Sequence, residues 1–554
     1  MTQLGWRVGI LVSLLLAAAL MLPVTEASAA PNAFPSATAN NPITATLHVG
    51  GSSTLLTRAF FGVNVGGDNS TESDYLNSTY IRFIRTAGLD DCNVTTGTKW
   101  TAGVTVGVAI PNGCGGTASF ASWCDSLTPH CVSEVGLPGE NNNSAEDAYD
   151  ARYIVDTLGF QPTYWSIGNE AFGWTHYGIP WQMWKITDDS VPTGTAYAVD
   201  VRNAIRAVRA VDPAAQFIGI QSYWCPDTYY TEPLAVMDGD SVSALACHLY
   251  PNAHTATPTT AQYFSTLISS ENISSNYYSI EHHIKDLCTR CSSLPIQISE
   301  LQGGPPKTPA PQDVEFDGAV WLAATLVQAL NAGISSVQTF ELHGNASCGY
   351  CLLSATDVPD PQGILYSDVL STLLDGHPVY NVSVTSTNTN LWATLIHGFP
   401  TNETQILFVN ANLTHSETFR LSTKFFSEGQ PGSIISWSES TSKPVVKEYA
   451  ALPSRVTVPA LGLVLISVTP KSSVPDAPPT ILQPRGPAHV TKGWSAAHAL
   501  RLGDAGSGFL SLPTVPRGPE GRAALMPPFD AEPQAWHGTT AKPGSWAVHG
   551  ATGR

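Results

Sequence analysis

Short β-rich runs recur along the first two thirds of the chain, most bounded by turn residues and separated by stretches long enough for a helix. Eight such runs cover residues 60–65, 80–85, 104–110, 163–169, 216–221, 242–250, 295–300 and 335–342. Helical periodicity lies between several of them, over residues 145–158, 196–211, 261–269 and 317–331. This alternation predicts an α/β fold, a (β/α)8 TIM barrel over residues 60–375. An open doubly wound sheet is the alternative, but no Gly-x-Gly-x-x-Gly follows an early strand.

The pattern changes after the barrel. Residues 376–470 contain short strands and turns, including LWATLIHG, QILFVNAN and GLVLISV, and show no convincing helix. This pattern predicts a C-terminal β-sandwich domain. The segment TATLHVG, within residues 30–59, is expected to add one more strand to it.

The two ends of the chain differ from the rest. Residues 1–29 combine Arg7, an apolar run and Ala-Ser-Ala, which is typical of a signal peptide; a retained anchor is the alternative, although the run is short for a spanning helix. Residues 471–554 hold 12 Pro and 11 Gly among 84 residues and no cysteine, so we expect a disordered tail there.

Charge limits the class of partner. Lys and Arg number 26 and Asp and Glu 44, which gives a net charge of −18. A chain this acidic repels phosphate backbones, so nucleic acid is not an expected partner. No later segment is long and apolar enough to cross a bilayer, so no membrane association is expected once the signal peptide is cleaved.

The ten cysteines and nine Asn-x-Ser/Thr sequons fit an exported glycoprotein. An even cysteine count in such a protein favours disulfides. Two C-x-x-C motifs, at 288–291 and 348–351, would alternatively suit zinc, but the gap between them is longer than in ordinary zinc sites. We therefore predict a secreted, disulfide-bonded protein without a metal or cofactor.

Two glutamates end barrel strands, where the reacting groups of such barrels lie. Glu170 follows the fourth run and Glu300 ends the seventh. Opposed carboxyl groups suit glycosidic cleavage, in which one protonates the leaving oxygen and the other attacks the anomeric carbon. For a retaining mechanism they should lie about 5 to 5.5 Å apart.

The sequence resembles the clan A glycoside hydrolases in these motifs. YWSIGNEAFGW and ISE are similar to the acid/base and nucleophile segments of α-L-arabinofuranosidases and of β-glucuronidase and heparanase-like families. The resemblance implies that Glu170 is the general acid/base, that Asn169 before it binds the sugar 2-hydroxyl and that Glu300 is the nucleophile. It departs at Ala171, where several of these families have Pro, and in lacking a Trp after the eighth strand, so it does not assign the sugar.

Further pocket residues follow from the same resemblance. IRTAG resembles the second-strand Arg motif, which implies that Arg85 holds the nucleophile ionised; pairing with Asp90 or Asp91 is the alternative. CHLYP resembles the sixth-strand His-x-Tyr segment, which implies that His248 lies in the pocket and Tyr250 orients Glu300. A histidine in an apolar strand can equally be a core residue.

Two more side chains are candidates for sugar contacts. Trp174 could stack on a sugar ring, as could Trp181 and Trp184, although Trp is also a common packing residue. Glu341 ends the eighth run and could bind sugar hydroxyls or replace Glu300 in the pair.

These observations predict a secreted retaining glycoside hydrolase acting on a polysaccharide or glycoside. A catalytically inactive carbohydrate-binding barrel is the alternative, and a zinc-dependent hydrolase is a third hypothesis. The inactive barrel would have its two carboxylates too far apart, or would pair Glu170 with a buried Arg.

Overall fold

The structure, a computed structural model, describes sixteen segments of the chain. They are residues 44–65, 70–86, 92–93, 98–99, 116–137, 144–168, 193–222, 242–252, 257–269, 272–274, 294–304, 310–343, 351–386, 389–398, 402–420 and 429–468. The chain divides into two compact units, Met1–Val490 and Thr491–Arg554, and all the described segments belong to the first.

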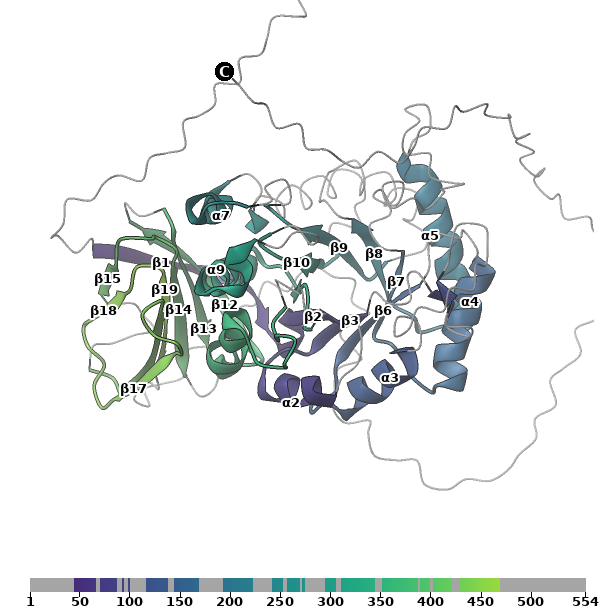
Figure 1. The fold of residues 1–554 in the computed structure, drawn as a ribbon, viewed down its shortest axis with the longest axis horizontal. Coiled ribbons are helices and arrows are strands. Elements are labelled where there is room, and N and C mark those ends of the chain that lie inside the picture. The colour runs from purple at the N-terminus through teal and green to yellow at the C-terminus, as the bar shows by residue number, and fades with distance from the viewer. Residues whose placement is uncertain are drawn as a thin grey trace, which may run out of the picture. The chain divides into compact units, whose positions relative to one another are not determined.

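Eight parallel strands close into a barrel, which confirms the predicted fold class (Figure 1). In barrel order they are β2 (Phe61–Val65), β3 (Phe83–Thr86), β6 (Val132–Leu137), β7 (Tyr164–Ile167), β8 (Phe217–Ser222), β9 (Ala244–Leu249), β10 (Ile296–Leu301) and β11 (Ser336–Thr339). Most residues of these strands are buried, polar ones included, as expected when helices cover the outer face and side chains fill the inside.

The third strand of the barrel was predicted in the wrong place. β6 pairs with β3 from Phe83↔Val132 to Thr86↔Val135 and with β7 on its other side, so it fills the third position. The predicted run 104–110 lies outside the described residues. The sequence favoured that run because VTVGVAI has no charged residue, whereas β6 carries a glutamate near its centre. Strand formation depends more on packing against neighbours than on local preference.

The eighth strand is shorter than predicted. β11 ends at Thr339, so Glu341 lies two residues beyond the strand and not at its last position.

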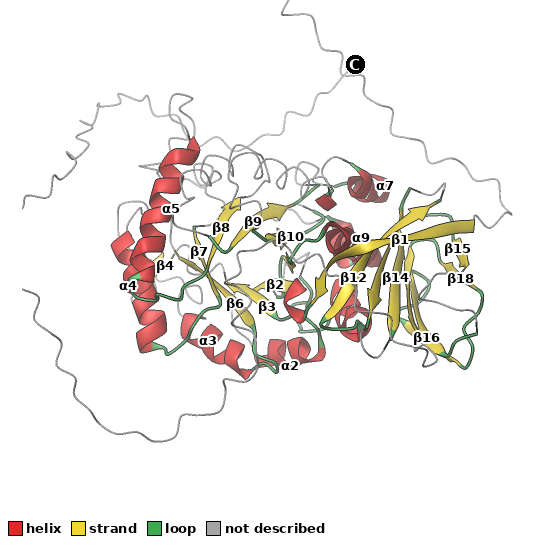
Figure 2. Cartoon of the chain, turned by 180° about the vertical axis from the view of Figure 1, so that it is seen from behind, coloured by secondary structure: helices red, strands yellow, loops and turns green. Residues whose placement is uncertain are grey.

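Helices follow most of the strands, and Figure 2 shows several of them in red beside the barrel. They are α2 (Ser70–Ser78), α3 (Gly116–Ser126), α4 (Ser144–Arg152), α5 (Thr193–Arg209), α7 (Thr260–Ser265), α9 (Phe316–Ala332) and α10 (Pro361–Ile364). A π-helical turn continues α4 over Tyr153–Thr157 and another continues α10 over Leu365–Val369; a two-stranded ribbon pairs β4 (Cys92–Asn93) with β5 (Thr98–Lys99). The four helices predicted from periodicity are therefore present, each within a few residues of its predicted bounds.

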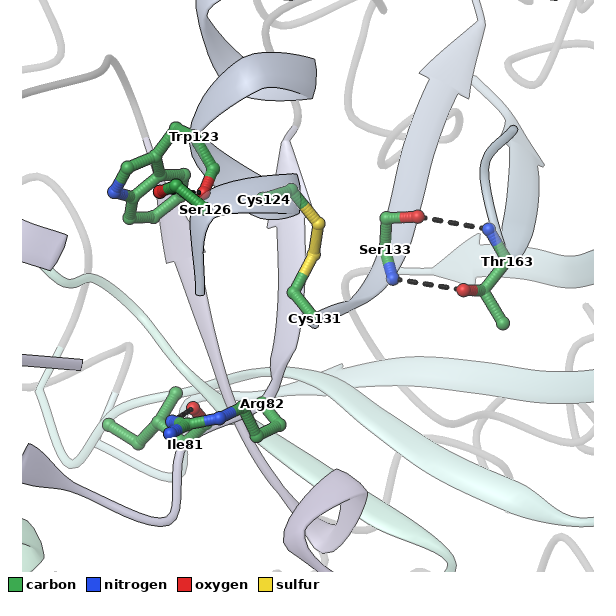
Figure 3. The surroundings of a disulfide bond; sticks show 8 residues. All are labelled: Ile81, Arg82, Trp123, Cys124, Ser126, Cys131, Ser133 and Thr163. Carbon is green, nitrogen blue, oxygen red and sulfur yellow. Dashed lines mark hydrogen bonds between the residues drawn. A yellow bond between two sulfur atoms is a disulfide. The ribbon is translucent and has the colours of Figure 1, made fainter. Parts of the chain in front are cut away.

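A disulfide ties the end of α3 to the start of β6 (Figure 3). It joins Cys124 to Cys131, seven residues apart. Cys247 and Cys351 are also disulfide-bonded. Cys351 belongs to one of the two C-x-x-C motifs, and a sulfur in a disulfide is not a thiolate ligand for zinc.

The C-terminal region is a nine-stranded, largely antiparallel sheet that also takes in the N-terminal strand. Its order is β17 (Val445–Tyr449), β16 (Gly432–Ser438), β19 (Gly462–Val468), β14 (Thr404–Asn410), β13 (Leu391–His397), β12 (His377–Thr385), β1 (Thr44–Leu56), β15 (Glu417–Arg420) and β18 (Arg455–Val458). β1 contains register shifts and joins the two halves, and the Phe408 and Phe419 rings pack 4.3 Å apart on β14 and β15.

α9 packs against both the barrel and this sheet. It is apolar all round and nearly all of it is buried, as expected for a helix enclosed on every side. Asn331 donates to the Ala393 carbonyl on β13 at 2.9 Å, and the Phe316 ring packs 4.9 Å from Trp437 on β16. No helix in the described part of the chain is long and apolar enough to span a membrane.

Candidate active site

Three neighbouring strands place polar side chains side by side inside the barrel. Asn64 on β2 is the register partner of Arg85 on β3, and Arg85 is the register partner of Glu134 on β6. Register partners point to the same face of a sheet. All three are 2% exposed or less, so they form a buried polar layer that includes two charged side chains.

Glu300 lies across the barrel from this layer and accepts three close contacts. Arg85 donates through Nη1 to Oε1 at 2.7 Å, and the Tyr250 hydroxyl donates to Oε2 at 2.6 Å. His248, the register partner of Glu300 on β9, places Nδ1 3.2 Å from Oε2. The structure thus brings together three of the residues that the sequence predicted around the nucleophile. The predicted orienting contacts of Arg85 and Tyr250 are present, and Asp90 and Asp91, the alternative partners of Arg85, lie outside the described residues.

The backbone beside Glu300 is also fixed. Asn64 Nδ2 donates to the Ser299 carbonyl at 2.8 Å. After the strand, Asn252 donates to the Gly303 carbonyl at 2.9 Å, and Gly303 N donates to Gln302 Oε1. A Cβ at Gly303 would clash with the Tyr263 hydroxyl, so only glycine fits this close approach.

Arg85 links two buried carboxylates. Besides Glu300, its Nε contacts Glu134 Oε1 at 3.2 Å, and Nη1 also donates to Asn64 Oδ1 at 2.8 Å. Burial raises the pKa of Glu134; the Arg85 charge opposes this rise and the Glu300 charge adds to it. Neither Glu134 nor Asn64 was predicted as a site residue. A glutamate inside an otherwise apolar strand is a signal for such a residue, but the strand itself was missed.

His248 is a neutral histidine. Burial lowers its pKa to about 3, against the opposing charge of Glu300. The neutral ring must therefore carry its proton on Nδ1 to donate to Glu300. With a neutral ring, this 3.2 Å contact is not an ion pair.

The pKa of Glu341 is raised, whereas that of His248 is lowered. Burial, with a further contribution from the negative charge of Glu300, raises its pKa to about 7. Its Oε1 lies 3.8 Å from the sulfur of Cys351. A carboxyl group with this pKa is partly protonated near neutral pH and can then donate a hydrogen bond.

Three predicted site residues, Asn169, Glu170 and Trp174, lie outside the described residues. β7 ends at Ile167 in the fourth barrel position, three residues before Glu170. The separation of Glu170 and Glu300 remains a prediction. In the described segments no group of three or more His, Cys, Asp and Glu side chains is arranged to hold a metal ion.

Several solved structures of other proteins have a similar fold. No protein-family model matches the chain, and no curated protein does. A glycoside hydrolase family 44 xyloglucanase from Paenibacillus polymyxa, solved with xyloglucan, superimposes with a TM-score of 0.56 at 12% identity, over 77% of this chain and 100% of its own. The family 51 α-L-arabinofuranosidase AbfB from Bifidobacterium longum gives 0.58 at 12% identity, over 78% and 100%. A family 51 arabinofuranosidase from Xanthomonas axonopodis pv. citri gives 0.54 at 12%, over 77% and 100%.

The chain shares its fold with clan A glycoside hydrolases. This confirms the resemblance drawn from the strand-end motifs, at the level of the fold. The clan A similarity spans both the barrel and the antiparallel sheet that follows it.

Because His248 is buried and neutral, we expect folding stability to decrease in acid, and we expect a substitution of His248 to reduce this decrease. In the unfolded chain this histidine takes up a proton below its ordinary pKa of 6.5, whereas in the folded protein it does so only near 3. The unfolded state therefore binds more protons in this window, and folding stability falls as the pH falls through it. We expect His248→Asn to reduce that pH slope by up to about 1.4 kcal/mol per pH unit. Denaturant unfolding between pH 7 and pH 4 measures the slope, and parallel slopes for both proteins would contradict the assignment.

Proposed function

We propose that the protein is a retaining glycoside hydrolase with Glu300 as the nucleophile and Glu170 as the general acid/base. The observation that carries this proposal is Glu300, a buried carboxylate near the carboxyl end of the seventh barrel strand that accepts hydrogen bonds from Arg85 and Tyr250 and lies 3.2 Å from His248 Nδ1. Reacting groups lie at this end of such barrels. A purely structural glutamate at this place would not need an arginine from β3 and a tyrosine from the end of β9 to donate to it.

The geometry suits nucleophilic attack. An ionised carboxylate has about four lone-pair positions. Arg85 occupies one on Oε1 and Tyr250 one on Oε2, which leaves a lone pair for the anomeric carbon. The donors stabilise the ionised form and fix its orientation, so little reorganisation is needed when the bond forms.

The proposed reaction has two steps. In the first, Glu300 attacks the anomeric carbon, the bond to the leaving oxygen breaks, and Glu170 gives that oxygen a proton. In the second, Glu170 takes a proton from water, the water oxygen attacks the same carbon, and Glu300 is released. Asn169 and Trp174 are proposed to contact the sugar, and a protonated Glu341 to donate to one of its hydroxyls.

The proposed substrate is a polysaccharide or glycoside. Support comes from the fold shared with a xyloglucanase and with arabinofuranosidases. A panel of aryl arabinofuranosides, glucosides, xylosides and glucuronides, followed by xyloglucan, tests the class and identifies the sugar. Absence of hydrolysis across the panel and on polysaccharides would favour the inactive carbohydrate-binding barrel.

The acid/base role of Glu170 predicts a dependence on the leaving group. With a dinitrophenyl glycoside the departing phenolate needs no proton, so Glu170→Ala should form the glycosyl-enzyme readily and accumulate it. With an alkyl glycoside, kcat/KM should fall on the order of 10²-fold to 10⁴-fold. Initial rates and burst kinetics on both substrates measure the difference. An equal loss on both would argue against this role.

We also propose that the protein is exported. The N-terminal 29 residues carry the features of a signal peptide, and the nine sequons are typical of an extracellular surface. Expression in a eukaryotic secretory host should release a mature protein whose N-terminus lies close to residue 30 and whose mass falls after enzymatic removal of N-glycans. Retention of residues 1–29 or absence of N-glycans would contradict the proposal.

A further inference from the structure

The deepest charged group in the barrel is not one of the proposed reacting groups. Glu134 is fully buried at the centre of β6, and its charge is opposed by a single described cation, Arg85. Arg85 is also the cation that contacts Glu300. A buried charge is costly unless paired, and here two carboxylates share one guanidinium.

The two carboxylates use different edges of that guanidinium. Glu134 contacts Nε at 3.2 Å and Glu300 contacts Nη1 at 2.7 Å. Nη1 also donates to Asn64, so the guanidinium plane is fixed on two sides. The planar fork of arginine allows this arrangement, whereas an ammonium group on a flexible chain would not fix it.

Resting on the function proposed above, we propose that Glu134 is a positioning residue of the reaction: it fixes the Arg85 guanidinium through Nε and reduces the positive charge that Arg85 exerts on Glu300. Glu134 thus limits how strongly Arg85 stabilises the Glu300 carboxylate. An arginine serving Glu300 alone would bind the carboxylate more strongly and make it a weaker nucleophile.

The charged and titratable groups around Glu134 and Glu300 lie on several barrel strands or just beyond their ends. Glu134 faces Arg85 on β3, Glu300 on β10 and its register partner Tyr164 on β7, and burial together with the Glu134 charge raises the pKa of that phenol. Glu300 in turn faces neutral His248 and Tyr250 at β9 and Glu341 beyond β11. Among these groups only Arg85 is a cation, so a change at Glu134 reaches Glu300 through Arg85 and through direct repulsion.

The first test is the pH dependence of kcat/KM. Glu134→Gln keeps an oxygen that can accept from Arg85 Nε but removes the negative charge. We expect the acidic limb of this profile to move to lower pH, because a negative charge beside the active-site carboxylate is removed. We also expect kcat at the optimum to fall severalfold with little change in KM. Glu134→Ala, which also removes the contact with Nε, should lower kcat further.

A matched control separates this role from the loss of any buried glutamate. Glu417→Gln makes the same change at a fully buried glutamate in β15 of the C-terminal sheet, and it should leave the acidic limb unmoved. A Glu134→Gln profile that superimposes on that of the unchanged protein would overturn the proposal. A limb that moves equally in both variants would overturn it too.

The second test does not depend on activity. Unfolding by denaturant at pH 7 is compared for Glu134→Gln, Glu300→Gln and the double variant. Each single change removes one attraction to Arg85 but also relieves repulsion between the carboxylates, so the double variant should be destabilised by more than the sum of the singles. An additive pair overturns the inference. If no glycoside is cleaved, the proposed function fails, and this cycle still decides whether Glu134 and Glu300 are coupled.

Discussion

Replacing Glu300 with Ala is expected to reduce kcat on an aryl glycoside by on the order of 10⁴-fold or more, since the group that forms the covalent intermediate is lost. The side chain is buried and accepts hydrogen bonds from Arg85 and Tyr250, so truncation also leaves Arg85 without one of its two carboxylates. Some loss of stability should accompany the loss of turnover. Near-normal turnover in a folded Glu300→Ala protein would refute the nucleophile assignment.

Azide distinguishes a lost nucleophile from a damaged site. The cavity left by Glu300→Ala can admit a small anion beside Arg85, Tyr250 and His248, and the anion can attack the anomeric carbon in place of the carboxylate. The product should be a glycosyl azide of inverted configuration, detectable by NMR, and its rate should rise with azide concentration. Activity that azide does not restore, in a protein with normal unfolding behaviour, would indicate that Glu300 is not the attacking group.

Removing Arg85 should be the most damaging change to the barrel itself. Arg85→Ala leaves Glu134 and Glu300 buried beside each other without their shared cation, and breaking a buried ion pair in this way destabilises a protein by about 3–5 kcal/mol. Stability should be lost as the pH rises, because the ionised carboxylates then repel each other, and it should be partly recovered in acid. Denaturant unfolding at pH 7 and pH 5 measures both effects.

Arg85→Lys keeps the charge and tests the geometry. A lysine ammonium is a point charge that cannot contact both carboxylates in fixed directions, so kcat should fall on the order of 10²-fold while the protein folds. Arg82→Lys is the matched control. Arg82 is a buried arginine near the start of the same strand, and its guanidinium donates to backbone carbonyls such as those of Leu76 and Thr128. Arg82→Lys should lower the free energy of unfolding without a shift in the pH profile of kcat/KM. An equal loss of kcat in both variants would contradict the role of Arg85.

Prediction of the fold from the sequence succeeded where the local signal was periodic. Seven of the eight barrel strands and all four predicted helices lie close to their expected positions, and α9 differs from its expected range by one residue at each end. The failure at β6 has a clear cause. From the sequence alone, a glutamate within a strand is expected to face solvent. Glu134 is buried because its strand lies in the barrel, where Arg85 on the neighbouring strand pairs with it.

The same cause explains which site residues could be found from the sequence and which could not. Strand-end glutamates and the His-x-Tyr and Arg motifs could be found from the sequence, since each lies in a recognisable run. Asn64 and Glu134 were not, because the strand that carries Glu134 was missed and the roles of both residues depend on contacts with Arg85 and Ser299 from other strands. The partners of Arg85 come from residues 21, 49 and 215 positions away.

The amino-acid sequence by itself determined the barrel, the β-domain after it and the identity of the buried nucleophile candidate, because hydrophobic period and strand-end chemistry are properties of short segments. Only the tertiary structure determined that one arginine serves two carboxylates, that His248 is neutral and that Glu341 retains its proton to about pH 7. Those properties depend on burial and on distances between strands far apart along the chain, which no local pattern contains.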